Sequence, residues 1–177
     1  KTQKALNSLV KYVYKKSDKI FISNIGFKKS LLSKNVDESK IYYMPNWAED
    51  FFVTNDHIKI EREKYSIPKG FIVMFAGNIG EAQDLEMVLK AAEQTKENEN
   101  IKWVFVGDGR KSKWLKENIK NKKLSKTVKL LGRHPSESMP YFFKHADVML
   151  VSLKDEFIFS LPVPGTVQSY MPSSKPV

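Results

Sequence analysis

The hydrophobic residues of the chain fall into short continuous runs separated by amphipathic stretches. The clearest runs cover residues 71–77 (FIVMFAG), 101–109 (IKWVFVGDG), 127–132 (TVKLLG) and 146–153 (ADVMLVSL). None of them alternates regularly between apolar and polar positions. Runs of strand length without alternation indicate strands that are buried on both faces, which is typical of parallel sheets.

Each run is followed by a segment with helical spacing of its apolar residues. In residues 81–95, for example, Leu85, Leu89 and Ala92 share one helical face. Helices are expected over residues 81–95, 111–123, 135–146 and 165–171. Strands that alternate with helices through right-handed crossovers predict an α/β protein with a doubly wound, Rossmann-like parallel sheet. The final residues KPV (175–177) open a fifth strand of the same series.

The first part of the chain shows a shorter series of the same kind. Helices are expected at residues 4–16 and 24–34, and strands at 18–23 and 40–45. Residues 47–70 have no sustained period and contain several turn signals, so we interpret them as a connector with one short helix. The predicted organisation is therefore a short α/β segment at 1–46, a connector at 47–70 and a sheet domain at 71–177.

Composition excludes several kinds of site. The 177 residues contain no cysteine, so disulfides, thiolate metal sites and cysteine nucleophiles are absent. The three histidines, His57, His134 and His145, do not have the spacing of metal ligands, and we expect no metal site. No apolar run approaches the ~20 residues of a membrane-spanning helix. Walker A, kinase and Gly-x-Ser-x-Gly patterns are missing as well.

The net charge of +10 is unevenly distributed along the chain. Residues 1–50 carry ten lysines against five acidic residues, and residues 101–129 carry ten basic residues against two acidic ones. Such an excess is consistent with a nucleic-acid or membrane partner, and equally with a solvated lysine-rich face. Both interpretations stay open at this point.

The turns after the predicted strands hold the candidate binding residues, because ligands of such sheets bind beyond the carboxyl ends of the strands. Gly77 and Gly80 flank a strand–helix turn where the backbone could approach a phosphate, although any tight α/β turn also favours glycine. Asp108, between Gly107 and Gly109, could accept from a ribose or act as the N-cap of the 111–123 helix; we favour the cap.

Two further turns offer groups for an anion. Arg133 follows Gly132 at the end of the third strand, and it is either a ligand residue or an ordinary surface arginine. Thr166 and Ser169 lie in the first turn of a helix behind Pro164 and Gly165. That turn is either an anion-binding site or an ordinary helix N-terminus without a ligand.

Five segments in this order resemble one known family. They are residues 17–46, 75–93 (FAGNIGEAQDLEMVLKAAE), 103–115 (WVFVGDGRKSKWL), 128–153 and 163–177 (VPGTVQSYMPSSKPV). Together they are similar to the family 4 glycosyltransferases of the GT-B class, in the subgroup that builds bacterial capsule, O-antigen and other cell-envelope polysaccharides. The resemblance implies two Rossmann-like domains, with residues 1–46 as the end of the acceptor-side domain and 71–177 as an incomplete donor-binding domain.

The same resemblance implies a function. We expect a retaining transferase that moves a sugar, often an N-acetylhexosamine, from a UDP-sugar to a lipid-linked or polysaccharide acceptor. It implies no cofactor, no metal and no nucleic-acid partner, and a cytoplasmic location with peripheral contact to the inner face of the cell membrane. Because the sequence starts without Met and stops within a strand, we expect a fragment of a longer protein that is inactive by itself.

The family's pattern assigns roles to particular residues, although it names no catalytic residue. By resemblance, the Gly77–Gly80 loop approaches the diphosphate or sugar, Gly132 and Arg133 lie at the base, and Ser169 lies near the ribose. Gly165, Thr166 and Val167 offer amide groups to the diphosphate. The complete set of expected nucleotide-sugar residues is Gly77, Asn78, Gly80, Gln83, Gly107, Gly132, Arg133, Pro164, Gly165, Thr166, Val167 and Ser169.

The sequence departs from that pattern at charged positions. Asn78 and Gln83 stand where many relatives have Arg and Lys, and Leu161 and Ser169 stand where many have two glutamates. Thr166 replaces a frequent Lys, and Ser174 a frequent Gly. The diphosphate would therefore be met by backbone dipoles and Arg133. Two alternatives to the transferase remain: an NAD-dependent α/β enzyme, resting on Asp108 and the glycine turns, and a basic module for nucleic acid or membrane.

Overall fold

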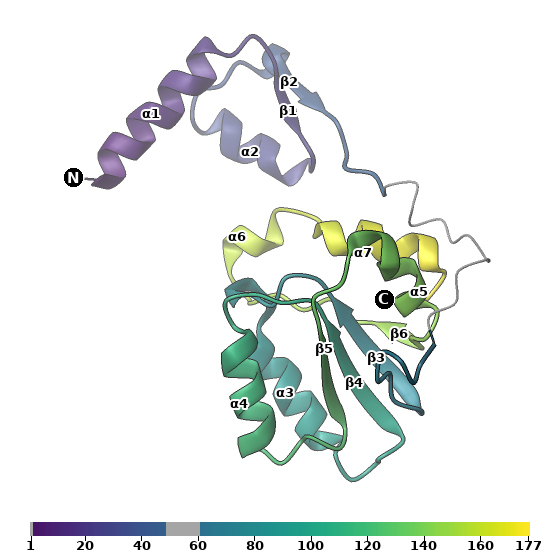
Figure 1. The fold of residues 1–177 in the computed structure, drawn as a ribbon. Coiled ribbons are helices and arrows are strands. Elements are labelled where there is room, and N and C mark those ends of the chain that lie inside the picture. Colours follow the sequence, from purple (N-terminus) through teal and green to yellow (C-terminus); the bar gives the residue numbers. More distant parts are fainter. Residues whose placement is uncertain (1, 49–60) are drawn as a thin grey trace. The chain divides into compact units, whose positions relative to one another are not determined.

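The computed structural model describes residues 2–48 and 61–177, which pack into two compact units (Figure 1). Unit 1 comprises residues 1–47 and 156–163, and unit 2 comprises residues 48–155 and 164–177. Half of the expected connector, residues 49–60, lies outside the described part, and the described residues 61–70 form turns and bends without the expected short helix. In the described ranges, no helix has both the length and the hydropathy needed to cross a membrane.

Unit 1 is a small α/β segment. Its elements are α1 (Thr2–Lys16), β1 (Ile20–Ile22), α2 (Gly26–Leu32), the 3-10 turn η1 (Glu38–Lys40), β2 (Ile41–Tyr43) and α6 (Phe157–Ser160). Strands β1 and β2 are parallel, with Ile20 opposite Ile41. Among the residues described in this unit, the buried cluster consists of Ile22, Leu31 and Val36, and α1 buries none of its residues.

Unit 2 contains a four-stranded sheet. Its strands are β3 (Phe71–Ala76), β4 (Ile101–Val106), β5 (Val128–Gly132) and β6 (Val148–Met149). All neighbouring pairs are parallel, and the order across the sheet is β5-β4-β3-β6. Its helices and turns are η3 (Glu81–Gln83), α3 (Leu85–Gln94), α4 (Ser112–Asn121), η4 (Ser136–Ser138), α5 (Met139–Phe143), α7 (Gly165–Tyr170) and η5 (Met171–Ser173).

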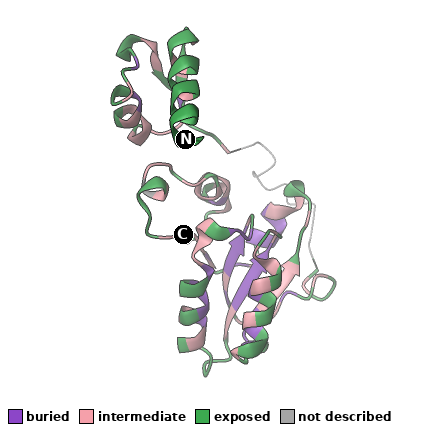
Figure 2. Cartoon of the chain, turned by 90° about the vertical axis from the view of Figure 1, so that its left-hand side faces the viewer, coloured by how far each residue is buried: buried purple, intermediate pink, exposed green. Residues whose placement is uncertain are grey.

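The two faces of this sheet have separate cores. Alternate residues of β3 and β4, such as Ile72, Met74 and Val104, pack with the aromatic residues of α5 and with Tyr170 of α7. The other alternate residues, such as Phe75 and Phe105, pack with α3 and α4. Figure 2 shows the buried residues gathered along these strands. The predicted doubly wound parallel sheet is therefore confirmed.

Most element boundaries shift by a few residues from the sequence-based expectation, and three elements differ in kind. The helix predicted over 81–95 is divided, because Asp84 has a left-handed backbone (φ 39°) between η3 and α3. The strand predicted over 146–153 is reduced to the two residues of β6. The expected final strand is not regular strand, but the Pro176 carbonyl accepts a 2.8 Å hydrogen bond from the Met149 amide beside β6.

Candidate functional site

The carboxyl ends of β3, β4 and β5 surround a cavity of about 920 Å³ in unit 2. Its lining comes from the loops after these strands, from η4 and from the start of α5. The lining residues are Gly77, Asn78, Val106, Gly107, Asp108, Gly109, Arg133, His134, Pro135, Ser136, Glu137 and Met139. Four of the predicted residues are thus brought together here: Gly77, Asn78, Gly107 and Arg133.

The two glycine loops of the cavity are bound to each other through their backbones. The Ile79 amide donates to the Asp108 carbonyl (2.9 Å), and the Lys111 amide donates to the Ile79 carbonyl (3.0 Å). A Cβ atom on Gly107 would overlap the Gly77 carbonyl, and one on Gly109 would overlap the Ile79 carbonyl. The close approach of the loops therefore requires glycine at 107 and 109, independently of any ligand.

The first loop contains three predicted residues, and they differ in whether they reach the cavity. These residues are Asn78, Gly80 and Gln83. Asn78 is exposed and lines the cavity. The Gly80 amide donates to Gln83 Oε1 at 3.0 Å, so the Gln83 side chain is turned back onto its own loop. Gly80 lines a smaller neighbouring hollow instead, together with Glu81. The structure therefore places only Asn78 of these three at the cavity.

Gly132 and Arg133 occupy the end of β5. The Gly132 carbonyl accepts from the Gly107 amide (2.7 Å), and its φ of +78° is in the left-handed region that favours glycine. Gly132 lines an adjacent hollow of about 710 Å³ along α4. Arg133 lines the cavity itself, is exposed, and lies near enough to Asp108 to favour its charged form.

The prediction that Asp108 is the N-cap of the following helix is wrong. The helix α4 begins at Ser112 and has Lys111 at its N-cap position. The carboxylate of Asp108 accepts instead from the Gly109 amide at 2.7 Å. The pKa of Asp108 is lowered by the nearby Ser112 hydroxyl, then by this amide and by Arg133. The Ser112 contact falls short of hydrogen-bond geometry, since its buried Oγ has no partner among the described residues.

The helix α7 carries the remaining predicted residues, and none of them lines the cavity. Pro164 is its N-cap residue, and the Val167 amide already donates to the Pro164 carbonyl (3.0 Å). Ser169 Oγ donates to the Gly165 carbonyl (3.2 Å). In the described part of the chain, the amides of Gly165 and Thr166 have no hydrogen-bond partner, so these two remain free to bind a ligand.

One side chain of α7 connects the helix to the cavity. The Thr166 methyl group lies 3.3 Å from the position that a Cβ on Gly77 would occupy. Any larger residue at 77 would therefore press against α7. Gly77 consequently serves as the contact between the first glycine loop and α7.

Sequence reasoning missed the side of the cavity built by η4 and α5. After the third strand, the sequence indicates only Gly132 and Arg133 as candidate ligand residues, whereas the cavity lining continues to Met139. His134, Pro135 and Ser136 lack a distinctive motif, and Met139 reads as an ordinary core residue. Their contribution depends on how α5 packs: the His134 ring lies 4.7 Å from the Phe142 ring, centroid to centroid. In the described residues, no group of three His, Asp or Glu side chains is arranged to hold a metal ion.

A comparison with family models identifies the chain. Residues 57–158, more than half of its length, match the family described as "Glycosyl transferases group 1". The chain belongs to this family. The cavity of this group 1 glycosyl transferase thus lies within the matched segment, whereas α7 lies beyond it.

Two curated proteins resemble this chain in sequence. The probable glycosyltransferase WbjE of Pseudomonas aeruginosa is 26% identical over 97% of the chain and 43% of its own length. The putative colanic acid biosynthesis glycosyl transferase WcaI of Escherichia coli is 26% identical over 70% of the chain and 31% of its own length. The chain therefore spans less than half the length of these relatives.

Solved structures share the fold of the chain. Anabaena HepE, in complex with UDP and glucose, superposes with a TM-score of 0.79 at 15% identity, covering 99% of this chain and 47% of HepE. WaaG, a glycosyltransferase involved in lipopolysaccharide biosynthesis, gives a TM-score of 0.70 at 14% identity, covering 90% of this chain and 43% of WaaG. At such low identity these matches establish the Rossmann-like fold of GT-B glycosyltransferases.

Proposed function

We propose that unit 2 binds a UDP-sugar and that the protein transfers the sugar to an acceptor. The observation that carries this proposal is the convergence of three loops on one cavity at the carboxyl ends of parallel strands. Gly77, Asn78, Gly107 and Arg133 are the predicted residues that line it. Membership of the group 1 family and the UDP present in the HepE structure support the same substrate class.

The charges of the cavity indicate how a nucleotide would be oriented. Glu137 of η4 would repel a diphosphate, whereas Val106, Pro135 and Met139 offer apolar surface to a base. We therefore place the base on the side of η4 and α5, near Arg133. The diphosphate would lie on the opposite side, toward Gly77 and Thr166.

Electrostatic stabilisation of the leaving diphosphate is the main catalytic task that this arrangement could perform. The free amides of Gly165 and Thr166 are fixed donors that would not need to reorganise as charge develops. Asn78, an uncharged donor, lies at the cavity where many relatives have a cation. We propose that these groups replace a basic clamp, which makes a modest affinity for UDP the expected outcome.

The finer description follows the family 4 resemblance. We propose retention of configuration, an N-acetylhexosamine as the sugar, and a lipid-linked or polysaccharide acceptor of capsule or O-antigen type at the inner membrane face. The names of WbjE, WcaI and WaaG support an envelope polysaccharide. We also propose that no metal is needed. Transfer that persists in excess EDTA would agree with this, and activity restored only by Mg²⁺ or Mn²⁺ would contradict it.

Calorimetric titration of the intact 177-residue chain with UDP tests the donor site. We expect measurable binding of UDP and a loss of about tenfold in affinity for Arg133→Ala, since a charge-assisted contact contributes about 1.5–3 kcal/mol at most. Arg110→Ala is the matched control, because Arg110 is exposed and does not line the cavity. Equal losses in both variants would show that net charge, not the cavity, governs binding.

The same titration separates the alternatives. Binding of NAD without binding of UDP would favour a dinucleotide enzyme over the transferase. Salt-sensitive binding of DNA or of anionic vesicles, with no response to millimolar UDP, would favour the basic module. Either result would overturn the proposed function.

A further inference from the structure

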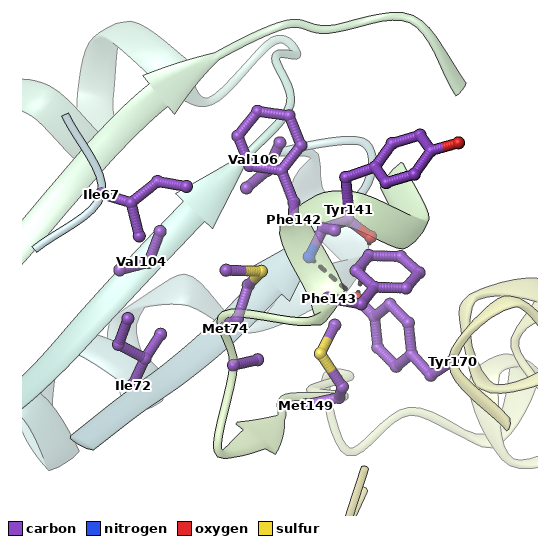
Figure 3. Close-up of a cluster of buried hydrophobic side chains, with 12 residues drawn as sticks. Ile67, Ile72, Met74, Val104, Val106, Tyr141, Phe142, Phe143, Met149 and Tyr170 are labelled. Carbon is purple, nitrogen blue, oxygen red and sulfur yellow. Dashed lines mark hydrogen bonds between the residues drawn. The ribbon is translucent and has the colours of Figure 1, made fainter. Parts of the chain in front are cut away.

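The hydroxyl group of Tyr170 joins α7 to the last residue of strand β3. It accepts a hydrogen bond from the Ala76 amide and donates one to the Ala76 carbonyl, both at 2.8 Å. Tyr170 is only 1% exposed, and Ala76 is 6% exposed. Figure 3 shows the Tyr170 side chain within the buried cluster, with the two hydrogen bonds as dashed lines.

This hydroxyl takes the place of a neighbouring strand. Strand β6 pairs with β3 only at Val73 and Met74, and the last ladder bond runs from the Leu150 amide to the Met74 carbonyl (2.7 Å). Beyond that point, among the residues that the structure describes, Ala76 has no hydrogen-bond partner on the β6 side except Tyr170. The chain order reverses between β3 and β6, so Tyr170 lies at the switch point where such sheets open to form binding crevices.

The same helix brings Thr166 against Gly77. Residues four positions apart in a helix lie on one face, so fixing Tyr170 also fixes Thr166. Thr166 in turn lies 3.3 Å from the Cβ position of Gly77, the residue after Ala76. Two adjacent residues of the β3 end, Ala76 and Gly77, are thus held by two residues one helical turn apart.

The surroundings of Tyr170 keep its hydroxyl in a donating state. Its ring packs edge-to-face on Phe143 of α5, with centroids 5.3 Å apart. Burial raises the pKa of Tyr170 to about 12. The phenol therefore stays protonated at working pH and holds both bonds to Ala76.

From these contacts we infer that Tyr170 is a positioning residue of the nucleotide site: its hydroxyl sets the distance between α7 and the Gly77–Gly80 loop. The inference rests on the proposed function for its effect on ligand binding. Its structural part, the coupling of α7 to β3, stands independently of any ligand.

The experiment compares two variants of the intact protein. Tyr170→Phe removes the hydroxyl and keeps the ring on Phe143. Phe143→Leu removes the ring contact from the same cluster and keeps the hydroxyl on Ala76, so it reports the effect of core destabilisation alone. Amide hydrogen exchange and the dissociation constant for UDP are measured for both variants and for the unmodified protein.

For Tyr170→Phe we expect faster exchange confined to α7 and to Ala76 and Gly77, and about tenfold weaker UDP binding. For Phe143→Leu we expect faster exchange spread over the cluster, and UDP affinity within about twofold of the unmodified protein for molecules that remain folded. Such a result would show that UDP affinity depends on the Tyr170 hydroxyl and not on the overall stability of the cluster.

The possible failures are distinct from one another. Unchanged exchange at α7 in Tyr170→Phe would overturn the inference, whatever happens to binding. Equal losses of UDP affinity in both variants would also overturn it. Absence of UDP binding in the unmodified protein would instead reject the proposed function, while the exchange data would still decide whether Tyr170 holds α7 in place.

Discussion

Gly107 and Gly132 both have positive φ values, but their surroundings differ completely. A Cβ on Gly107 (φ +134°) would overlap the Gly77 carbonyl, whereas a Cβ on Gly132 (φ +78°) would meet no atom within 4 Å. The first glycine is required by packing between two loops, and the second only by its backbone conformation. Their substitution separates these two causes.

Gly107→Ala is expected to lower the free energy of unfolding by about 3 kcal/mol or more, because the loop backbone must move apart in addition to being strained. Gly132→Ala is expected to cost about 1 kcal/mol, the strain of a left-handed alanine. Urea denaturation of both variants measures the difference. A similar cost at the two positions would show that backbone strain alone explains the glycines.

At Ser174, both the family resemblance and the backbone conformation favour glycine. Many relatives have glycine there, and Ser174 is in the left-handed region with φ 55°. Ser174→Gly should therefore raise the free energy of unfolding by about 0.5–1 kcal/mol. Ser173→Gly is the control with the opposite sign, since Ser173 lies in η5 and its hydroxyl donates to the Tyr170 carbonyl at 2.6 Å. Thermal unfolding of both variants measures these changes.

At the scale of elements, one carboxylate connects the loops that follow three strands. Glu81 of η3 forms ion pairs with Lys111 before α4 (2.8 Å) and with Lys154 after β6 (3.2 Å). The Lys154 amide also donates to the Ala82 carbonyl at 2.8 Å. These contacts hold together the loops that follow β3, β4 and β6.

The pH dependence of stability should report this connection. Hydrogen bonds from Lys111 and then Lys154 lower the pKa of Glu81 below its ordinary 4.5. A lowered folded-state pKa stabilises the protein above pH 4.5, and that stabilisation is lost as pH falls through the folded-state value. Glu81→Gln should therefore show a smaller decrease of Tm between pH 5 and pH 3 than the unmodified protein, and 1 M salt should reduce the difference. Parallel curves for the two proteins would contradict the prediction.

Elements governed by local pattern were predicted well, and those governed by distant contacts were not. Strands β3, β4 and β5 are predicted because each is a mostly apolar run of strand length, interrupted only by Lys102 in β4 and Lys129 in β5. Strand β6 was predicted too long, because the Tyr170 hydroxyl takes over its role at Ala76 and no local pattern reveals that exchange. Likewise the glycine loops could be placed at strand ends, but the part of the cavity formed by η4 and α5 depends on packing in three dimensions.

At the scale of the whole molecule, the two units have very unequal cores. Counting the described residues, the buried cluster of unit 1 has three members, whereas unit 2 has a cluster of twelve on each face of its sheet. Helix α1 is amphipathic and leaves Leu6, Leu9 and Val13 about half exposed. Burial of apolar surface is the main source of stability, so most of it must reside in unit 2.

Hydrogen exchange of the 177-residue chain should show this imbalance. We expect the amides of β1, α2 and β2 to be at least about 100-fold less protected than those of β3 and β4, because few buried contacts must break for them to open. Mass spectrometry of peptides from the two units measures the ratio. Equal protection would mean that the chain unfolds as one cooperative unit despite its unequal cores.

The bonds between Ala76 and Tyr170 also concern the order in which the chain can be completed during translation. The two residues are separated by 94 positions. At about 5–20 residues per second, a ribosome needs about 5–20 seconds to synthesise that stretch. During this interval β3, β4 and β5 can already pair, while the edge of β3 at Ala76 stays open on one side. The backbone groups of Ala76 therefore stay without their hydrogen-bond partner during synthesis, because Tyr170 is made only after the four strands of the sheet.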